Sequence, residues 1–194
     1  SIPAVLGMLA ISSANIVDGF FIGNYVGDFG LAAINITFPI FSLLFGFALM
    51  LAIGSSVVSG KLIGQGDIKS ASIIFSKTMV CITLFSFITC TGLFLNIETV
   101  LYLFGADENL TKIAIEYLSV ILIFIPFLMI GVVLDYFVRV DNRPNLAFIA
   151  LLFSAVINVI LDWFLIVYLQ KGIFGAALAT GISQLALIFI LLPH

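Results

Sequence analysis

The chain has 194 residues, of which 63% are hydrophobic and 9% are charged, and its formal net charge is -3. An ordinary soluble domain has about 25% charged residues, so water is not the main solvent of this chain. Twenty Phe against seven Lys plus Arg exclude a nucleic-acid partner and make membrane lipid the first partner to consider. The two Cys and the single histidine, His194, offer no clustered metal ligands.

Six apolar runs are each long enough to cross about 30 Å of hydrocarbon as a helix. In chain order they lie near residues 2–26, 32–59, 68–95, 112–137, 145–169 and 172–193. Turn or charge chemistry separates them, in "GDFG", "GQGDIKS", "GADENLT", "RVDNRPN" and "QKG". The sequence therefore predicts an all-α polytopic membrane protein whose residues 1–194 form a single bundle of six transmembrane helices.

The basic residues predict how the bundle is oriented. Five of them lie in or beside the second-to-third and fourth-to-fifth connections, and two remain for the other face: Lys61, Lys69, Lys77, Arg139 and Arg143 against Lys112 and Lys171. Connections rich in Lys and Arg stay in the cytoplasm. We therefore expect both chain ends on the cytoplasmic side of the plasma (inner) membrane. The start at "SIP" without Met and the stop at "LLPH" predict a piece of a longer chain.

Polar residues occur at one depth in three of the predicted helices. Asp18 lies nine residues inside the outer end of its helix, and Asp162 and Thr180 each lie eight residues inside theirs. At 1.5 Å per residue, all three are about 12 to 14 Å deep. Asn158 precedes Asp162 by one turn on the same helical face. These four residues are the candidate functional site.

The candidate site contains two acids and no basic partner at its depth. A carboxylate in the membrane is costly, so Asp18 and Asp162 are expected to face the bundle interior and to have a partner. A proton, Na+ or a cationic ligand would serve, and the carboxylates with Asn158 and Thr180 supply the oxygen ligands that a hard cation prefers. The structural alternative is that Asn and Thr cross-link helices and each Asp is a neutral, hydrogen-bonded acid.

The fourth predicted helix has three further features. Pro126 interrupts it in mid-membrane and is expected to kink it, either for packing or as a hinge. Tyr117 lies above the polar layer, where its hydroxyl either joins the network or has only a structural role. Asp135 and Arg139, four residues apart, predict an exposed ion pair worth a few tenths of a kcal/mol.

The order of several short segments resembles the multidrug and toxic compound extrusion (MATE) family. The segments are Pro3, Asp18, "IGNYVGDFGLAAINITFP", "FVRVDNRP", "NVILD" and "GIFGAALAT", and together they cover the whole chain. The resemblance implies a transporter of twelve helices in two six-helix lobes, which expels organic cations in exchange for Na+ or H+. It implies no enzymatic activity and no bound cofactor. The six spans match the N-terminal lobe of that plan.

The resemblance also assigns roles to particular residues. Asp18, Asn158, Asp162 and Thr180 match the cation-coupling site of the N-terminal lobe, Tyr117 matches an aromatic neighbour of that site, and Pro3 matches a proline linked to bending. The family binds its drugs, which are cationic and amphiphilic, in a cleft between the lobes. The chain as given is therefore expected to need the C-terminal lobe as a partner for transport.

Three other functions remain as alternatives. A flippase for a lipid-linked precursor is built on a similar two-lobe plan, but it is expected to hold pyrophosphate with mid-membrane cations, which this sequence lacks. An intramembrane aspartyl protease also needs two membrane acids, but its Tyr-Asp and Gly-x-Gly-Asp signatures are missing around Asp18 and Asp162. A non-catalytic membrane scaffold would tolerate Asn at both positions.

Overall fold

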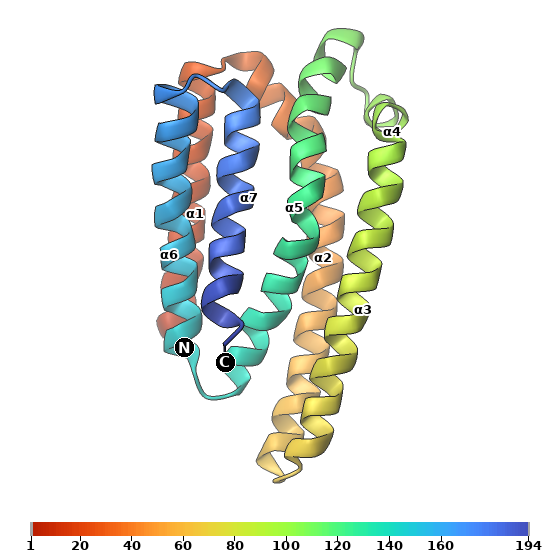
Figure 1. Cartoon of the computed structure of the whole chain (residues 1–194), viewed down its shortest axis with the longest axis vertical. Coiled ribbons are helices and arrows are strands. Elements are labelled where there is room, and N and C mark those ends of the chain that lie inside the picture. The colour runs from red at the N-terminus through yellow and green to blue at the C-terminus, as the bar shows by residue number, and fades with distance from the viewer. Residues whose placement is uncertain (1, 194) are drawn as a thin grey trace.

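The structure is a computed structural model that describes residues 2–193, with the side chains of residues 2–4 and 8 excepted. Six long helices run alternately up and down (Figure 1). They are α1 (Ile2–Tyr25), α2 (Asp28–Gly64), α3 (Ile68–Leu95), α5 (Glu108–Val140), α6 (Pro144–Asp162) and α7 (Gly172–Leu191). All six are long and apolar enough to cross a membrane, when α6 is taken with the segment that continues it. The predicted all-α polytopic fold is confirmed.

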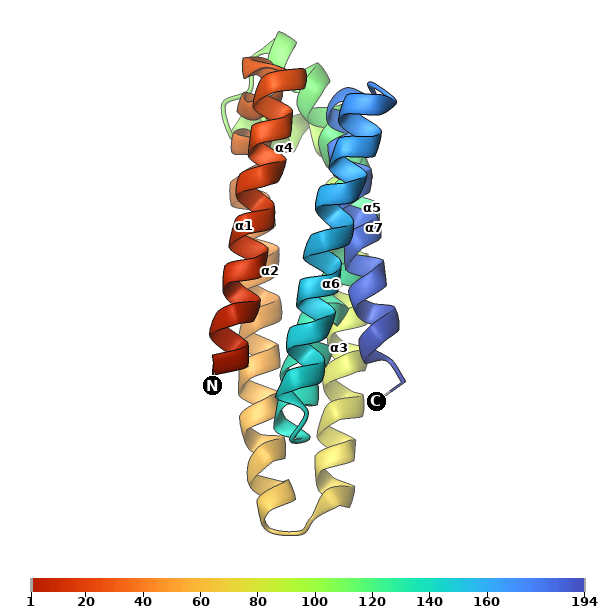
Figure 2. The ribbon, with the colours of Figure 1, turned by 90° about the vertical axis from the view of Figure 1, so that its left-hand side faces the viewer.

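Helix α5 lies at the centre of the bundle. It packs against α2 and α3 on one side and against α6 and α7 on the other, while α1 packs mainly against α6. Figures 1 and 2 show the α2–α3 hairpin extending beyond the lower ends of the other helices. Because backbone polar groups within hydrocarbon find no water, this helical arrangement satisfies them inside each segment.

The helix boundaries differ from the prediction mainly in α2 and α5. Helix α2 begins four residues earlier and ends five residues later than predicted, because Asp28 in its first turn and Lys61 in its last suit the helix dipole. Helix α5 begins at Glu108, where the side chain of Asp107 accepts a hydrogen bond from the backbone N–H of Leu110 at 2.8 Å. Charged residues that look like loop sequence are therefore helix ends.

Two helical segments were not predicted. Helix α4 (Ile97–Leu103) is too short to span a membrane and lies beside the upper end of α3. A π-helical segment, η1 (Trp163–Tyr168), continues α6 directly after Asp162. Its wider turns appear in the hydrogen bond from the N–H of Leu169 to the carbonyl of Phe164, five residues earlier. Single π-turns inserted in α-helices occur frequently at functional sites.

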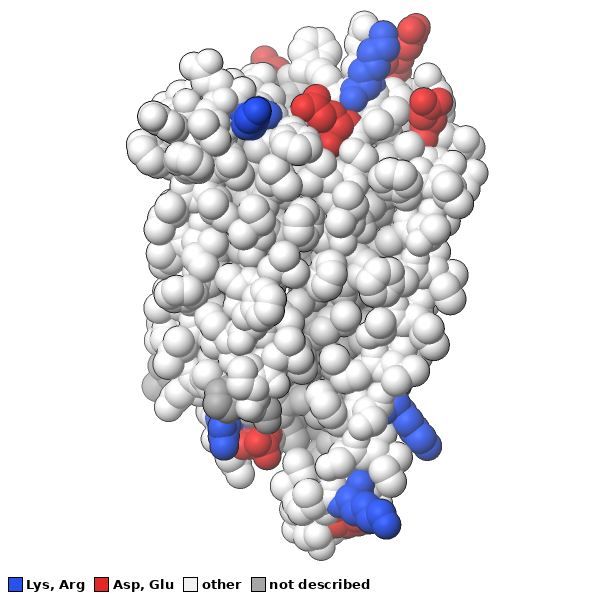
Figure 3. Space-filling model, viewed as in Figure 1, with Lys and Arg blue, Asp and Glu red and all other residues white. Residues whose placement is uncertain are grey.

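Exposed charged side chains lie at the two ends of the bundle. The face shown in Figure 3 has a white middle, with acidic and cationic side chains at both its upper and its lower end. The lower end includes the α2–α3 hairpin and the α5–α6 connection, which hold the five basic residues named above. This distribution is what a membrane-spanning bundle requires, since charge in hydrocarbon is costly.

The ion pair on α5 differs from the prediction. Asp135 is only 9% exposed, and Arg139 donates two hydrogen bonds to its carboxylate, at 2.9 and 3.0 Å. The prediction of an exposed pair was wrong because helical spacing does not reveal that α5 is covered by neighbouring helices at its lower end. A bidentate, largely buried ion pair has a better-defined geometry than an exposed one.

The two predicted hinge prolines have different outcomes. Pro126 is buried within α5, and the helix continues across it. In Figure 1, the first half of α5 stands upright and the second half slants towards α6, which agrees with the predicted kink. Pro3 belongs to α1, but its side chain lies outside the described residues. The hinge role of both residues stays a prediction.

Candidate functional site

Asp162 is the most completely buried acid in the described part of the chain. It is the last residue of α6 and its side chain is 0% exposed. Within the described residues, neither of its carboxylate oxygens has a hydrogen-bond partner. A buried polar group without a partner costs about 1–3 kcal/mol, and more when it is charged. Asp162 is therefore a group in need of a proton or a cation.

Asp18 approaches Asp162 from helix α1. It is half-buried, and its Oδ1 atom is buried without a hydrogen-bond partner among the described residues. The two carboxyl groups are near enough to interact electrostatically and to form a hydrogen bond once one of them carries a proton. Two ionised carboxylates carry like charges and therefore repel each other, and neither can donate a hydrogen bond to the other. A shared proton or a bound cation would satisfy the oxygens of both.

Tyr117 lies on α5 within electrostatic reach of both acids. Its hydroxyl is a group that can donate a hydrogen bond, which neither ionised carboxylate can do. The site is thus built from three helices, because α6 packs against both α1 and α5 in the folded bundle.

Asn158 belongs to a row of buried polar residues on α6. Ser154, Asn158 and Asp162 follow one another at intervals of four residues, and all three are buried. The hydroxyl of Ser154 donates a hydrogen bond of 2.8 Å to the carbonyl of Ser183 and so ties α6 to α7. Sequence reasoning missed Ser154, although its four-residue spacing from Asn158 was visible.

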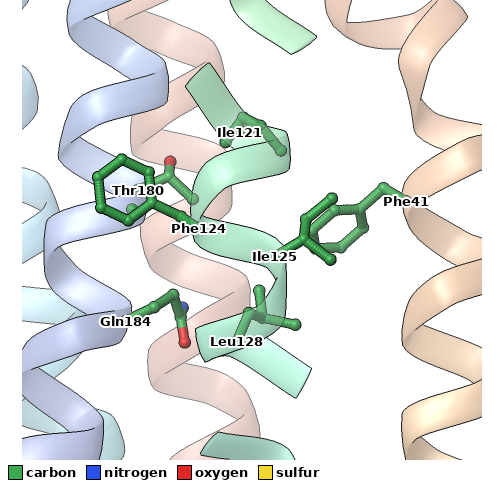
Figure 4. Close-up of a pocket in the computed structure, with 8 residues that line it drawn as sticks. Phe41, Ile121, Phe124, Ile125, Leu128, Thr180 and Gln184 are labelled. Carbon is green, nitrogen blue, oxygen red and sulfur yellow. The ribbon is translucent and has the colours of Figure 1, made fainter. Parts of the chain in front are cut away.

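Thr180 has a different environment from the acid pair. It is half-buried on α7 and lines a small hollow between α2, α5 and α7 (Figure 4). The other residues around the hollow are Phe41 of α2, Ile121, Phe124, Ile125 and Leu128 of α5, and Gly181 and Gln184 of α7. The hollow measures about 10 Å³, so it has room for about one water molecule and not for a drug. A role of Thr180 as a cation ligand stays a prediction. Gln184, one turn further along α7, was missed.

The donor set fits a hard monovalent cation by its chemistry. It offers carboxylate and amide oxygens, which are ligands that small hard cations accept. No cluster of three or more His, Cys, Asp or Glu residues exists within the described residues. Taken together, the fold and this arrangement define a polytopic α-helical membrane protein that buries an acid pair inside its bundle.

Comparison with known proteins identifies the family. The profile of the MatE family matches residues 3–164, and the chain belongs to this family, as the motifs predicted. The multidrug export protein MepA of Staphylococcus saprophyticus subsp. saprophyticus is 30% identical to it over 185 residues, which are 95% of this chain and 41% of MepA. The chain therefore spans about two fifths of the length of that curated relative.

Solved structures agree with this assignment. A multidrug resistance MATE family transporter of the MOP superfamily, in an outward-facing conformation, superposes with a TM-score of 0.91 at 26% identity, over 97% of this chain and 42% of that one. A MOP superfamily transporter from Pyrococcus furiosus superposes with a TM-score of 0.90 at 26% identity, over the same shares, and its binding pocket is described as having reverse polarity. The six helices thus correspond to one lobe of a MATE transporter.

Proposed function

We propose that the complete protein containing this chain exports cationic, amphiphilic molecules by secondary active transport. In this proposal Na+ or H+ enters in exchange for the drug, and its site is formed by Asp18 and Asp162, with Asn158 and Thr180 completing it and Tyr117 beside it. The observation that carries the proposal is the buried acid pair, three of whose carboxylate oxygens have no partner among the described residues. The MepA relative is itself named a multidrug export protein.

The proposed coupling follows from the charge of the pair. When Asp18 and Asp162 bind neither a proton nor Na+, their uncompensated negative charge favours an arrangement of the helices that admits water or a cationic drug. When a proton or Na+ binds, the net charge of the pair is lowered and the helices can close around the bound ion. A ligand shifts an equilibrium only by its differential affinity for the two arrangements. Drug and coupling ion then promote each other's release by linkage.

Several helices are available to carry this change. Asp18 lies on α1, which contacts α2 much less than α6, and Asp162 lies where α6 becomes the π-helical segment η1. A π-helical turn can change to an α-helical one by a small shift of hydrogen bonds, which would rotate the residues beyond it. Binding at the pair is thereby connected to two movable elements.

The test replaces Asp162 in the complete protein. We expect Asp162→Asn to abolish efflux of the cationic dye ethidium from preloaded right-side-out vesicles under an imposed inward Na+ or pH gradient, with insertion unchanged. Asp67→Asn is the matched control, because it alters an acid in the α2–α3 connection. Efflux by Asp162→Asn at the wild-type rate under both gradients would refute the proposal. Running the two gradients separately identifies the coupling ion.

A direct measurement of ion binding is a second test of the proposed site. Trp163 follows Asp162 in the chain, so its fluorescence should respond when Na+ or a proton occupies the pair. Titration with Na+ at several pH values should give saturation in the wild type and none in Asp162→Asn. Competition between Na+ and protons would appear as weaker Na+ binding at lower pH.

The alternatives make different predictions. A lipid-linked precursor flippase would move a phosphorylated lipid between leaflets instead of ethidium. An intramembrane aspartyl protease would cleave a peptide and be blocked by an acid-directed inhibitor. A scaffold would show no change in any transport assay when Asp18 and Asp162 are replaced by Asn.

The proposed location is the plasma membrane, with both ends in the cytoplasm. Cysteine introduced at Lys69 should then react with a membrane-impermeant thiol reagent only in inside-out vesicles, and cysteine at Lys112 only in right-side-out cells. The opposite pattern would reverse the orientation.

A further inference from the structure

The outward face of α3 combines two lysines with a continuous apolar strip. The buried face of this helix consists of Ala71, Thr78, Ile82, Ser86 and Cys90. On the opposite side, Val80, Leu84 and Ile88 are 59%, 58% and 72% exposed and follow one another at four-residue intervals. Lys69 and Lys77 are exposed at the lower end of the same side.

Lys77 lines a shallow groove at the point where this strip begins. The groove measures about 330 Å³ and is lined by Ser76, Lys77, Val80 and Cys81. The Ser76 hydroxyl donates to the carbonyl of Ser72 at 3.0 Å, so the charged donor at the groove is the ammonium group of Lys77. The groove has a cationic group at one end and apolar side chains at the other.

The length of α3 places Lys77 near the membrane boundary. The 28 residues of this helix rise about 42 Å, whereas the hydrocarbon core is about 30 Å thick. If the upper end of α3 lies at the outer boundary, about eight residues extend beyond the inner one, as the protruding hairpin in Figure 2 indicates. Lys77 then lies at the inner boundary and Lys69 in or below the headgroup layer.

Lys69 and Lys77 have no acidic partner within the residues that the structure describes. The acid next to them, Asp67, has its carboxylate bonded to the backbone N–H of Ser70 at 3.0 Å. Figure 3 shows cationic side chains along this lower part of the bundle. The charge at the groove is therefore available to an anion from the membrane.

We propose that this face of α3 binds an anionic phospholipid of the adjoining leaflet. Lys77 and Lys69 hold its phosphate-bearing headgroup, and one acyl chain lies along Val80, Leu84 and Ile88. The charge matches a phosphate, the exposed strip matches a hydrocarbon chain, and the groove connects the two. A lysine that contacts the anionic headgroup directly is expected to contribute up to about a fivefold preference. The proposal does not depend on the export function.

Cys81 provides a probe within the groove itself. It is exposed, whereas Cys90 is buried, so a small fluorophore attached in the folded protein reports from the site. The complete protein, with cysteines outside this chain replaced by Ser, is labelled and placed in nanodiscs of phosphatidylcholine. Quenching by phosphatidylglycerol with brominated acyl chains is compared with quenching by brominated phosphatidylcholine, which gives the relative affinity of the two lipids.

We expect phosphatidylglycerol to be preferred several-fold in the wild type. Lys77→Ala should lower the preference about fivefold, and Lys69→Ala should lower it to a lesser extent. Lys61→Ala is the matched control, because it removes one charge from the same hairpin but from α2. It should leave the ratio nearly unchanged. Retention of phosphatidylglycerol adducts in native mass spectrometry of the unlabelled variants should follow the same order.

Three results would overturn the proposal. Equal quenching by the two lipids in the wild type would show no headgroup selection. An equal loss in Lys61→Ala and Lys77→Ala would show a diffuse surface potential instead of a site. Quenching by neither lipid would show that another part of the protein covers this face of α3.

Discussion

Replacing Gly181 with Ala tests whether the contact between α5 and α7 is as close as the structure indicates. A Cβ atom at Gly181 would lie 2.6 Å from Cε2 of Phe124 and nearer still to Cγ and Cδ2 of the same ring. Carbon atoms in ordinary contact are about 3.5–4.0 Å apart, so the ring would have to move by about 1 Å or more. Rotation about χ2 does not help, because Cγ lies on the rotation axis.

The expected cost follows from that displacement. Either Phe124 changes its χ1 rotamer or α5 and α7 separate, and insertion of a methyl group into a packed interface typically costs about 1–3 kcal/mol. We expect Gly181→Ala to lower the free energy of unfolding, measured by denaturation in mixed micelles, by that amount. Gly92→Ala on α3 is the control, because no neighbouring atom lies within 4 Å of its new Cβ and Ala favours the helix.

A double-mutant cycle locates the effect. In the Phe124→Ala background the ring is absent, so Gly181→Ala should cost less than about 0.5 kcal/mol. If Gly181→Ala is as mild as Gly92→Ala in the wild type, or if its cost is the same without the ring, then the inferred contact between α5 and α7 is wrong.

Two further predictions concern charged groups. Arg139→Ala should lower the free energy of unfolding by about 1–3 kcal/mol, because it leaves the largely buried Asp135 carboxylate without its partner. Lys112→Ala, whose ion pair is exposed, should change it by less than about 0.5 kcal/mol in the same denaturation assay. Equal effects of the two substitutions would contradict the buried pair. The hydrogen bond that Asp67 accepts at the start of α3 holds the pKa of its carboxyl below the usual range, so the cap stabilises the helix above about pH 4 and is lost as pH falls through the lower folded value. Hydrogen-exchange protection of amides 69–71 should decrease there in the wild type, and an equal decrease in Asp67→Ala would argue against the cap.

Much of the fold was predictable because the membrane imposes simple rules. Apolar runs of about 20 residues can cross hydrocarbon only as helices, and this fixed the number and approximate position of the six spans. The ends were less predictable, since Asp28, Lys61 and Glu108 resemble loop residues yet lie within the first or last helical turns. Helix α4 was missed because a seven-residue segment has too few residues to give a periodic signal.

The candidate site was predictable in part. Counting residues from the predicted helix ends selected Asp18 and Asp162. An acid within hydrocarbon costs free energy, so acids are rare in such segments and stand out in an apolar sequence. Ser154 and Gln184 were missed because one hydroxyl or amide in a membrane helix is common and carries little signal. The small hollow beside Thr180 was not predictable at all, because its walls come from three helices.

The sequence by itself determined that the chain crosses a membrane six times, because hydropathy and length act locally along the chain. Its motifs also indicated the MATE family, to which the chain belongs. Only the tertiary structure decided which polar groups meet. It brings Asp18 near Asp162 and leaves three of their oxygens unpaired within the described residues, it buries the Asp135–Arg139 pair, and it turns Lys77 outwards. These features depend on how far each helix is rotated about its axis, and packing between helices fixes that rotation.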